Sequence, residues 1–295
     1  MKIVYFSKGS RGFRCLDFML ANNYFVKTIV AVQEEPELTD LAIEHEIPIL
    51  IPDRVNTEEF AGKLKGLEPD LFVLSGYNKI LRPVIFDIPP LGTINLHGGR
   101  LPEYRGAAPI NWQIIHGETI GGCAIIYIDE GIDTGDIIRQ EYYRILPEDT
   151  HASVLEKTLD IFPPLLVEVL EDIQSGNVTV TPQNPLEGCY HTRRYPRDSK
   201  IHWRDMTDVQ VHNLVRAMHG PYPSAFTYRG ETKIEIEKTS LLDESIRGIP
   251  GRVPMFKNGG VVVLAKNRGL QVEKIAVEGQ SVIPEEYFEL GDDLG

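Results

Sequence analysis

Short apolar runs alternate with helical patterns along the first two-thirds of the chain, and this alternation constrains the fold more than any other feature. The runs are rich in β-branched and aromatic residues, and they cover residues 2–6, 25–32, 47–51, 71–74, 93–96 and 123–128. Apolar residues at helical spacing lie between several of these runs, at 13–21, 38–44 and 57–64. Because strands that alternate with helices form βαβ units, the sequence predicts an α/β fold with an open, mostly parallel sheet.

The C-terminal part of the chain shows a different pattern. An amphipathic helix is expected at 209–218. Short strand-like stretches punctuated by glycines follow, at 225–228, 233–237, 260–265 and 270–275. Such strands are typical of a small β-rich domain, for which an OB-like barrel is one fitting architecture. We therefore predict an α/β domain over 1–190, a linker over 191–204 and a C-terminal helix with a small β domain over 205–295.

Polar side chains follow two of the predicted strands. Asn95 and His97 are two residues apart, so on a strand both side chains point to the same face. The run at 123–128 leads into a carboxylate-rich loop that contains Asp133. At the carboxyl end of a parallel sheet these groups suit acyl transfer, with an amide for an oxyanion, an imidazole for a proton and a carboxylate to orient it. From composition alone, a hydrogen-bonded structural Asn–His pair remains the alternative.

Three ordered motifs connect these residues, namely NLHG at 95–98, LPEYRGAAP at 101–109 and DEGIDTG at 129–135. In this order they resemble the 10-formyltetrahydrofolate-dependent formyltransferase family, and the chain looks most similar to the sugar-nucleotide N-formyltransferases. The resemblance implies a Rossmann-like formyltransferase fold, with residues 1–190 as the catalytic domain. It makes Asn95, His97 and Asp133 the catalytic trio, with N10-formyltetrahydrofolate as the formyl donor and no metal.

The resemblance also implies two sets of binding residues. The folate would lie against the segment after the fourth strand and the loop at 129–135, through Tyr77, Ile80, Leu81, Asp129, Ile132 and Thr134. The acceptor would contact Ser10, Arg11, Gly98 and Arg105, and also Arg100, which departs from the commonest family pattern and adds a guanidinium suited to a phosphate or carboxylate. At residues 7–12 a plain tight turn is the alternative, because neither the dinucleotide fingerprint nor the P-loop pattern is met. For Arg105 the alternative is a structural anchor.

Charge and cysteine content narrow the class of protein. The net charge of −13 argues against a nucleic-acid acceptor, because proteins that bind phosphates usually present a basic face. One basic and aromatic cluster lies at 190–203, where we favour a solvated linker over a nucleic-acid surface. The three scattered cysteines indicate neither disulfides nor a metal site and favour a reducing cytosol. Without a long apolar run or a signal-peptide pattern, a cytoplasmic protein that does not enter a membrane is expected.

Four features favour a nucleotide-linked amino sugar as the acceptor. They are the acidic charge, HGGR at 97–100, RRYPRDS at 193–199 and GPYPSAF at 220–226. The predicted reaction is formyl transfer to the primary amine of a dTDP- or UDP-linked amino-deoxysugar, for surface polysaccharide such as lipopolysaccharide. The alternative is a methionyl-tRNA formyltransferase, and a formyltetrahydrofolate hydrolase would use the same trio. The sequence leaves a homodimer open.

Overall fold

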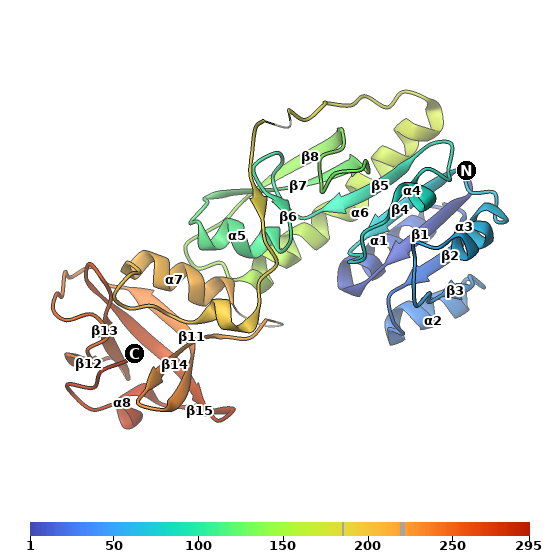
Figure 1. Cartoon of the computed structure of the whole chain (residues 1–295). Helices are drawn as coiled ribbons and strands as arrows, with labels where there is room; N and C mark the ends of the chain where they lie inside the picture. The colour runs from blue at the N-terminus through green and yellow to red at the C-terminus, as the bar shows by residue number, and fades with distance from the viewer. Residues whose placement is uncertain (185, 219–221) are drawn as a thin grey trace. The chain divides into compact units, whose positions relative to one another are not determined.

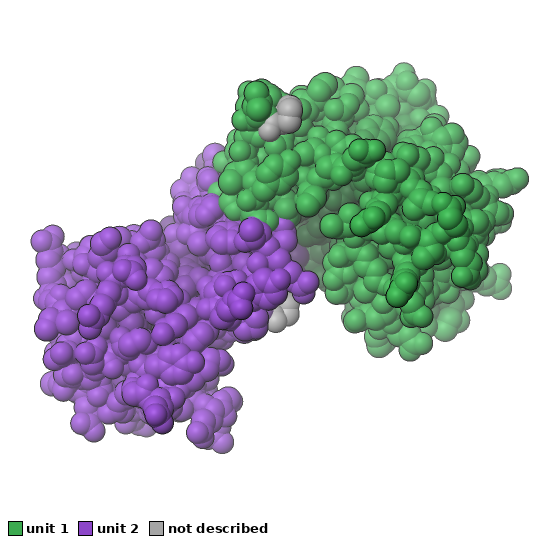
Figure 2. Space-filling model, viewed as in Figure 1, with its two compact units in different colours: residues 1–106, 122–143, 156–191 green, residues 107–121, 144–155, 192–295 purple. Residues whose placement is uncertain are grey.

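The computed structural model describes residues 1–184, 186–218 and 222–295. The chain divides into two compact units, coloured separately in Figure 2. Unit 1 comprises residues 1–106, 122–143 and 156–191, and unit 2 comprises residues 107–121, 144–155 and 192–295. Pro185 and residues 219–221, which include the start of the GPYPSAF segment, lie outside the described residues.

Unit 1 is built on a seven-stranded sheet (Figure 1). From edge to edge its strands are β3 (Ile49–Leu50), β2 (Val26–Ala31), β1 (Ile3–Ser7), β4 (Leu71–Ser75), β5 (Thr93–His97), β7 (Ile120–Tyr127) and β8 (Ile137–Arg144). The strand pairs from β3 through β5 are parallel, whereas β7 runs antiparallel to β5. The predicted Rossmann-like, mostly parallel sheet is confirmed.

Burial explains why the central strands are continuous apolar runs. Every residue of β1 and β4 is buried, and the rings of Phe6 and Phe72 on these strands meet edge to face with centroids 5.2 Å apart. When a strand is covered on both faces, all of its side chains are buried, so polar and apolar residues do not alternate along it. The strand order turns back between β1 and β4, and open α/β sheets bind ligands beyond the carboxyl ends of strands at such a point.

The helices of unit 1 follow strands β1, β2, β3, β4 and β8 in the chain. They are α1 (Gly9–Ala21), α2 (Pro36–Glu44), α3 (Glu58–Lys65), α4 (Pro83–Phe86) and α6 (His151–Ser175), and the first turn of α6 belongs to unit 2. A short parallel ribbon is formed by β6 (Arg105–Gly106) and β9 (Tyr190–His191). Helix α1 begins at Gly9 rather than at residue 13, and the Gly9 N–H donates to the Glu35 carboxylate at 2.8 Å. A protein carboxylate therefore takes the position at this helix N-terminus that a phosphate would use.

Unit 2 contains an antiparallel sheet in the order β10 (Ala225–Arg229), β11 (Thr232–Leu241), β14 (Gly269–Val277), β13 (Gly260–Leu264) and β12 (Met255–Lys257), with β15 (Gln280–Val282) also paired to β14. Its helical elements are α5 (Pro109–Ile115), the 3₁₀ turn η1 (Pro196–Ser199), α7 (Asp208–Ala217) and α8 (Pro284–Tyr287). The predicted β-rich C-terminal part of the chain is confirmed.

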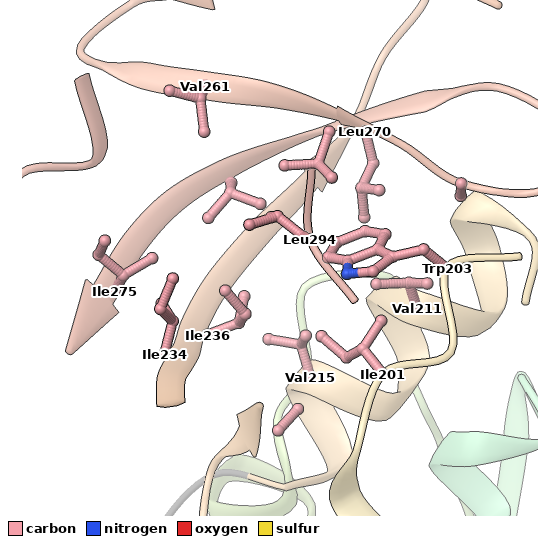
Figure 3. Packing of buried hydrophobic residues seen from close by; sticks show 14 of the residues in the cluster. Ile201, Trp203, Val211, Val215, Ile234, Ile236, Val261, Leu270, Ile275 and Leu294 are labelled. Atoms are coloured by element: carbon pink, nitrogen blue, oxygen red, sulfur yellow. The ribbon is translucent and has the colours of Figure 1, made fainter. Parts of the chain in front are cut away.

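Helix α7 and the preceding segment close the core of unit 2 (Figure 3). Val211 and Val215 on α7 and the indole of Trp203 point toward the buried faces of β11 and β14. The indole N–H donates to the Thr227 hydroxyl at 2.9 Å, so the one polar atom of this large ring is paired inside the core.

The division into units differs from the predicted domains 1–190, 191–204 and 205–295, because two segments from the first half of the chain belong to unit 2. The reason is visible at α5, where Ile110 and Ile114 are buried and the Asn111 amide donates to the Ala217 carbonyl of α7 at 2.8 Å. In the described parts of the chain, no helix combines the length and the hydrophobicity that a membrane crossing requires.

Candidate active site

Strand β5 carries two of the predicted catalytic residues to the carboxyl end of the sheet. His97 is the last residue of β5 and is 5% exposed, and Asn95 is half-buried on the same face of the strand. Neighbouring β7 pairs with both positions, through Ile126 opposite Asn95 and Ala124 opposite His97. Both side chains are therefore held by a strand that is paired on both sides, and a rigid element of this kind keeps its side chains precisely oriented.

Asp133 reaches these two residues from the loop between β7 and β8. Its Oδ2 lies 3.4 Å from His97 Nδ1, and its Oδ1 lies 3.5 Å from Asn95 Nδ2. Oδ2 also accepts a hydrogen bond from the Gly106 N–H at 2.9 Å. The backbone of Asp133 is left-handed, with φ of +53°, which aspartate tolerates better than most residues. The structure thus brings the predicted trio together around one carboxylate.

The second ring nitrogen of His97 also has a protein partner. Nε2 lies 2.6 Å from the backbone carbonyl of Tyr104. A carbonyl oxygen can only accept a hydrogen bond, so Nε2 carries a hydrogen and donates it. Nδ1, which faces Asp133, is therefore the ring atom at which His97 can exchange a proton.

In the loop at 129–135, two of the predicted folate contacts bind each other. The Asp129 carboxylate accepts hydrogen bonds from the Thr134 hydroxyl at 2.6 Å and from the Gly131 N–H at 2.9 Å. These bonds shape the turn that presents Asp133. Ile132 is the apolar side chain that the loop offers to a ligand, with 52% of its surface exposed.

The segment after β4 contains the other predicted folate contacts. Leu81 and the Tyr77 ring are buried in the core, with the Tyr77 ring 5.2 Å from that of Phe6. Burial raises the pKa of Tyr77 to about 12, and no described residue forms a hydrogen bond with its hydroxyl. Ile80 is 69% exposed. A buried hydroxyl without a partner and two exposed isoleucines fit an aromatic ring with polar edges, such as a pterin.

Arg11 and Gly98, two predicted acceptor contacts, lie side by side at the end of β5. Arg11 donates to the Leu96 carbonyl at 3.0 Å and stacks on the Phe162 ring, with the guanidinium carbon 4.9 Å from the ring centroid. A Cβ at position 98 would lie 2.8 Å from an Arg11 nitrogen, so a side chain there would require the guanidinium to shift. Ser10 is exposed on the first turn of α1.

The two remaining predicted acceptor contacts have partners within the protein. The Arg100 side chain lies 3.6 Å from the Glu103 carboxylate and over the Tyr104 ring. Arg105 is only 1% exposed, and its guanidinium donates to Gln183, Asn184 and Glu187. An arginine with these contacts fits the alternative of a structural anchor better than a contact with the acceptor.

Gln183 is a residue near the trio that the sequence analysis did not identify. Its amide nitrogen donates to the backbone carbonyls of Asp133, at 3.0 Å, and of Gly135, at 2.7 Å. It follows Asp133 by 50 residues, so no local spacing or motif could have revealed the contact. Among the described residues, His, Cys, Asp and Glu side chains form no group of three or more that could hold a metal ion.

Two family models match the chain. One, described as formyl transferase, matches residues 1–170, and the other, described as formyl transferase, C-terminal domain, matches residues 194–290. The chain belongs to the formyl transferase family. This formyl transferase also resembles individual proteins over its whole length. Methionyl-tRNA formyltransferase from Acetivibrio thermocellus is 31% identical over 306 residues, which cover 100% of this chain and 98% of the relative.

Solved structures share the fold. The N-formyltransferase from Helicobacter canadensis, in complex with folinic acid and dTDP-3-aminofucose, has a TM-score of 0.70 at 20% identity, covering 92% of this chain and 98% of that one. HypX from Aquifex aeolicus, in complex with tetrahydrofolic acid, has a TM-score of 0.67 at 18% identity, covering 97% of this chain. The match covers 46% of HypX, so this formyl transferase spans about half the length of that protein.

The predicted amino-sugar acceptor is wrong. Methionyl-tRNA formyltransferases from several organisms are 28–33% identical to this formyl transferase over most of its length. The net charge sums over the whole surface and carries no information about one face. Arg100 contacts Glu103 and Tyr104, and the guanidinium groups of Arg193 and Arg197 lie over the Tyr195 ring. These arginines therefore have structural explanations that do not require a sugar nucleotide.

Proposed function

We propose that this formyl transferase moves the formyl group of N10-formyltetrahydrofolate to the amino group of methionine on a charged tRNA. The observation that carries the proposal is the extent of the similarity. The alignment with the Acetivibrio thermocellus enzyme covers 100% of this chain, so it includes residues 192–295 of unit 2 as well as the trio.

The reaction requires one bond to form and one to break. The methionine nitrogen attacks the formyl carbon, and the bond from that carbon to N10 of the folate breaks. The nitrogen loses one proton and N10 gains one, so proton transfer and stabilisation of the formyl oxygen are the tasks for the protein.

The trio supplies groups for both tasks. The Asn95 amide has two N–H groups, of which one faces Asp133 at 3.5 Å, so the other can donate to the negatively charged formyl oxygen. His97 and Asp133 form the proton relay. Because Nε2 donates to the Tyr104 carbonyl, Nδ1 is the ring atom that would take the proton from the attacking nitrogen and return it to N10, with the Asp133 carboxylate holding the ring in place.

The folate would lie between the segment after β4 and the loop at 129–135. Ile80 and Ile132 offer exposed apolar surface there, and the Tyr77 hydroxyl is free to form a hydrogen bond. In this arrangement Asp129 and Thr134 act on the folate through the shape of the loop, since their side chains bond each other.

A local feature is compatible with a nucleic-acid acceptor despite the net charge of −13. Arg193 and Arg197 are exposed and lie 5.9 and 5.3 Å from the centroid of the Tyr195 ring, which is itself 51% exposed. Exposed cations combined with an aromatic ring suit both a phosphate backbone and a stacked base.

The test is incubation of the purified protein with N10-formyltetrahydrofolate and methionyl-tRNA, followed by chromatography of the amino acid released from the tRNA. We expect N-formylmethionine in an amount equal to the tetrahydrofolate formed, and a rate lower by at least about 100-fold from His97→Ala. Release of formate without any amine would overturn the proposal. Formylation of a nucleotide-linked amino sugar without formylation of methionyl-tRNA would also overturn it.

A further inference from the structure

Gln183 connects the loop of the catalytic aspartate to a separate part of the chain. Its side-chain amide donates to the carbonyls of Asp133 and Gly135, the residues on either side of Thr134. The segment before Gln183 is itself anchored, because Thr181 and Ile137 exchange two backbone hydrogen bonds of 2.8 and 2.9 Å. One side chain therefore holds the loop backbone on both sides of its turn.

Arg105 holds Gln183 in turn. Its Nε donates to Gln183 Oε1 at 3.0 Å, and its two terminal nitrogens donate to the carbonyls of Glu187 at 2.9 Å and Asn184 at 3.2 Å. The bond from Arg105 leaves the Gln183 amide only one orientation, with its nitrogen toward the Asp133 loop. The next residue, Gly106, donates its backbone N–H to the Asp133 carboxylate.

The side chain and the backbone of Asp133 are thus both held by hydrogen bonds that lead back to the adjacent residues Arg105 and Gly106. Gly106 binds the carboxylate, while Arg105, through Gln183, binds the backbone of the same residue. The backbone of Asp133 is left-handed, a conformation that costs free energy for any residue other than glycine. Without the Gln183 hydrogen bonds, the loop could relax and turn the carboxylate away from Asn95 and His97.

We infer that Gln183 and Arg105 are positioning residues of the formyl-transfer site. They contact neither the folate nor the acceptor, and they act by keeping the Asp133 carboxylate between Asn95 and His97. The inference rests on the proposed function for the identity of the reaction, but its geometry does not depend on which amine is formylated.

The decisive variant is Gln183→Glu. A glutamate has nearly the same shape and still accepts from Arg105, but its carboxylate cannot donate to the two carbonyls. We expect kcat to fall about 10- to 100-fold, because a small displacement of a catalytic group is enough to cost that much. The KM values for folate and acceptor should stay within about twofold, since no substrate contact is removed.

The matched control is Gln271→Glu in unit 2. Gln271 is buried, whereas Gln183 is half-buried. Like that of Gln183, its amide donates to a backbone carbonyl, that of Lys257 at 2.8 Å. The Gln271→Glu substitution should lower thermal stability about as much as Gln183→Glu does and leave kcat unchanged. An equal loss of kcat in both variants would overturn the inference, and so would a kcat for Gln183→Glu within twofold of wild type. A raised KM with unchanged kcat would instead show that Gln183 touches a substrate, which also overturns it.

A spectroscopic measurement separates this inference from the proposed function. In protein with ¹⁵N-labelled histidine, the ring resonances of His97 can be assigned by comparison with His97→Gln. We expect Gln183→Glu to shift them in the free protein and Gln271→Glu to leave them in place. If wild type fails to formylate methionyl-tRNA but these resonances shift, the acceptor is wrong and the positioning role stands. Unchanged resonances would overturn the positioning role even if methionyl-tRNA is formylated.

Discussion

At the scale of single residues, the site depends on a carboxylate that serves several partners. The Asp133 oxygens face an amide, an imidazole and a backbone N–H at distances between 2.9 and 3.5 Å. The carboxylate can therefore orient Asn95 and His97 together. His97 is further restricted by the Tyr104 carbonyl, which leaves Nδ1 as the atom that exchanges a proton. Substitution of any one residue of the trio should therefore change the orientation of the other two.

The substitutions Asn95→Ala, His97→Ala and Asp133→Asn should each lower kcat by at least about 100-fold. Asn95→Ala removes the donor to the formyl oxygen, and the other two interrupt the proton relay. Steady-state kinetics measures the effect, and circular dichroism establishes that each variant is folded. A folded variant with near-normal turnover would show that its residue takes no part in the mechanism.

At the scale of elements, helix α7 is fixed at its first turn by an ionic cluster. The buried Asp208 carboxylate accepts hydrogen bonds from Asn267 at 2.8 Å and from Arg268 at 2.6 Å. Burial by itself raises the pKa of Asp208, but the hydrogen bonds outweigh burial and leave the pKa below its ordinary value. The cluster joins the start of the helix to the turn before β14.

We expect Asp208→Asn to lower the free energy of unfolding at neutral pH by about 2 kcal/mol, the cost of losing a charged hydrogen bond. Because the folded protein holds this proton more weakly than the unfolded chain does, the stabilisation is complete above the ordinary pKa of about 4 and is lost as the pH falls through the lower, folded value. Urea unfolding followed by tryptophan fluorescence at several pH values measures it. The exposed residue Asp205, changed to Asn, is the control. A difference that persists undiminished in acid would contradict the ionic explanation.

At the scale of the whole molecule, the two units are interleaved along the chain. Residues 107–121 leave unit 1 and pack within unit 2, and the chain then returns to β7. Helix α5 therefore packs against α7, where Ala217 follows Asn111 by 106 residues. Strand β7 lies between this excursion and the catalytic loop at 129–135.

A chain that ends at residue 191 should fold poorly. It keeps α5 but lacks α7, so Ile115 loses the core of unit 2 against which it packs and the Asn111 amide loses the Ala217 carbonyl. We expect a broad, non-cooperative thermal transition and unprotected α5 amides in hydrogen exchange. Adding residues 192–295 as a separate polypeptide should restore protection. Cooperative unfolding of the shortened chain with protected α5 amides would contradict this division into units.

The sequence by itself determined the sheet, the helices between its strands and the shared face of Asn95 and His97. Those features depend on residues close together in the chain, through β-branched runs and the period-two alternation of a strand. The carboxylate-rich loop after the run at 123–128 offered Asp133, which the family resemblance made a member of the trio and which the structure places beside them. The acceptor was misjudged because net charge and short arginine-rich segments do not reveal which contacts those arginines make within the fold.

Only the tertiary structure decided how Asp133 is held and where α5 belongs. Gln183 meets Asp133 across 50 residues, and Asn111 meets Ala217 across 106. Arg105 was predicted to contact the acceptor, with a structural anchor as the alternative, and in the fold its guanidinium donates to three protein oxygens. Such contacts arise only when distant segments are brought together by the packing of the core. Local sequence patterns therefore do not predict them.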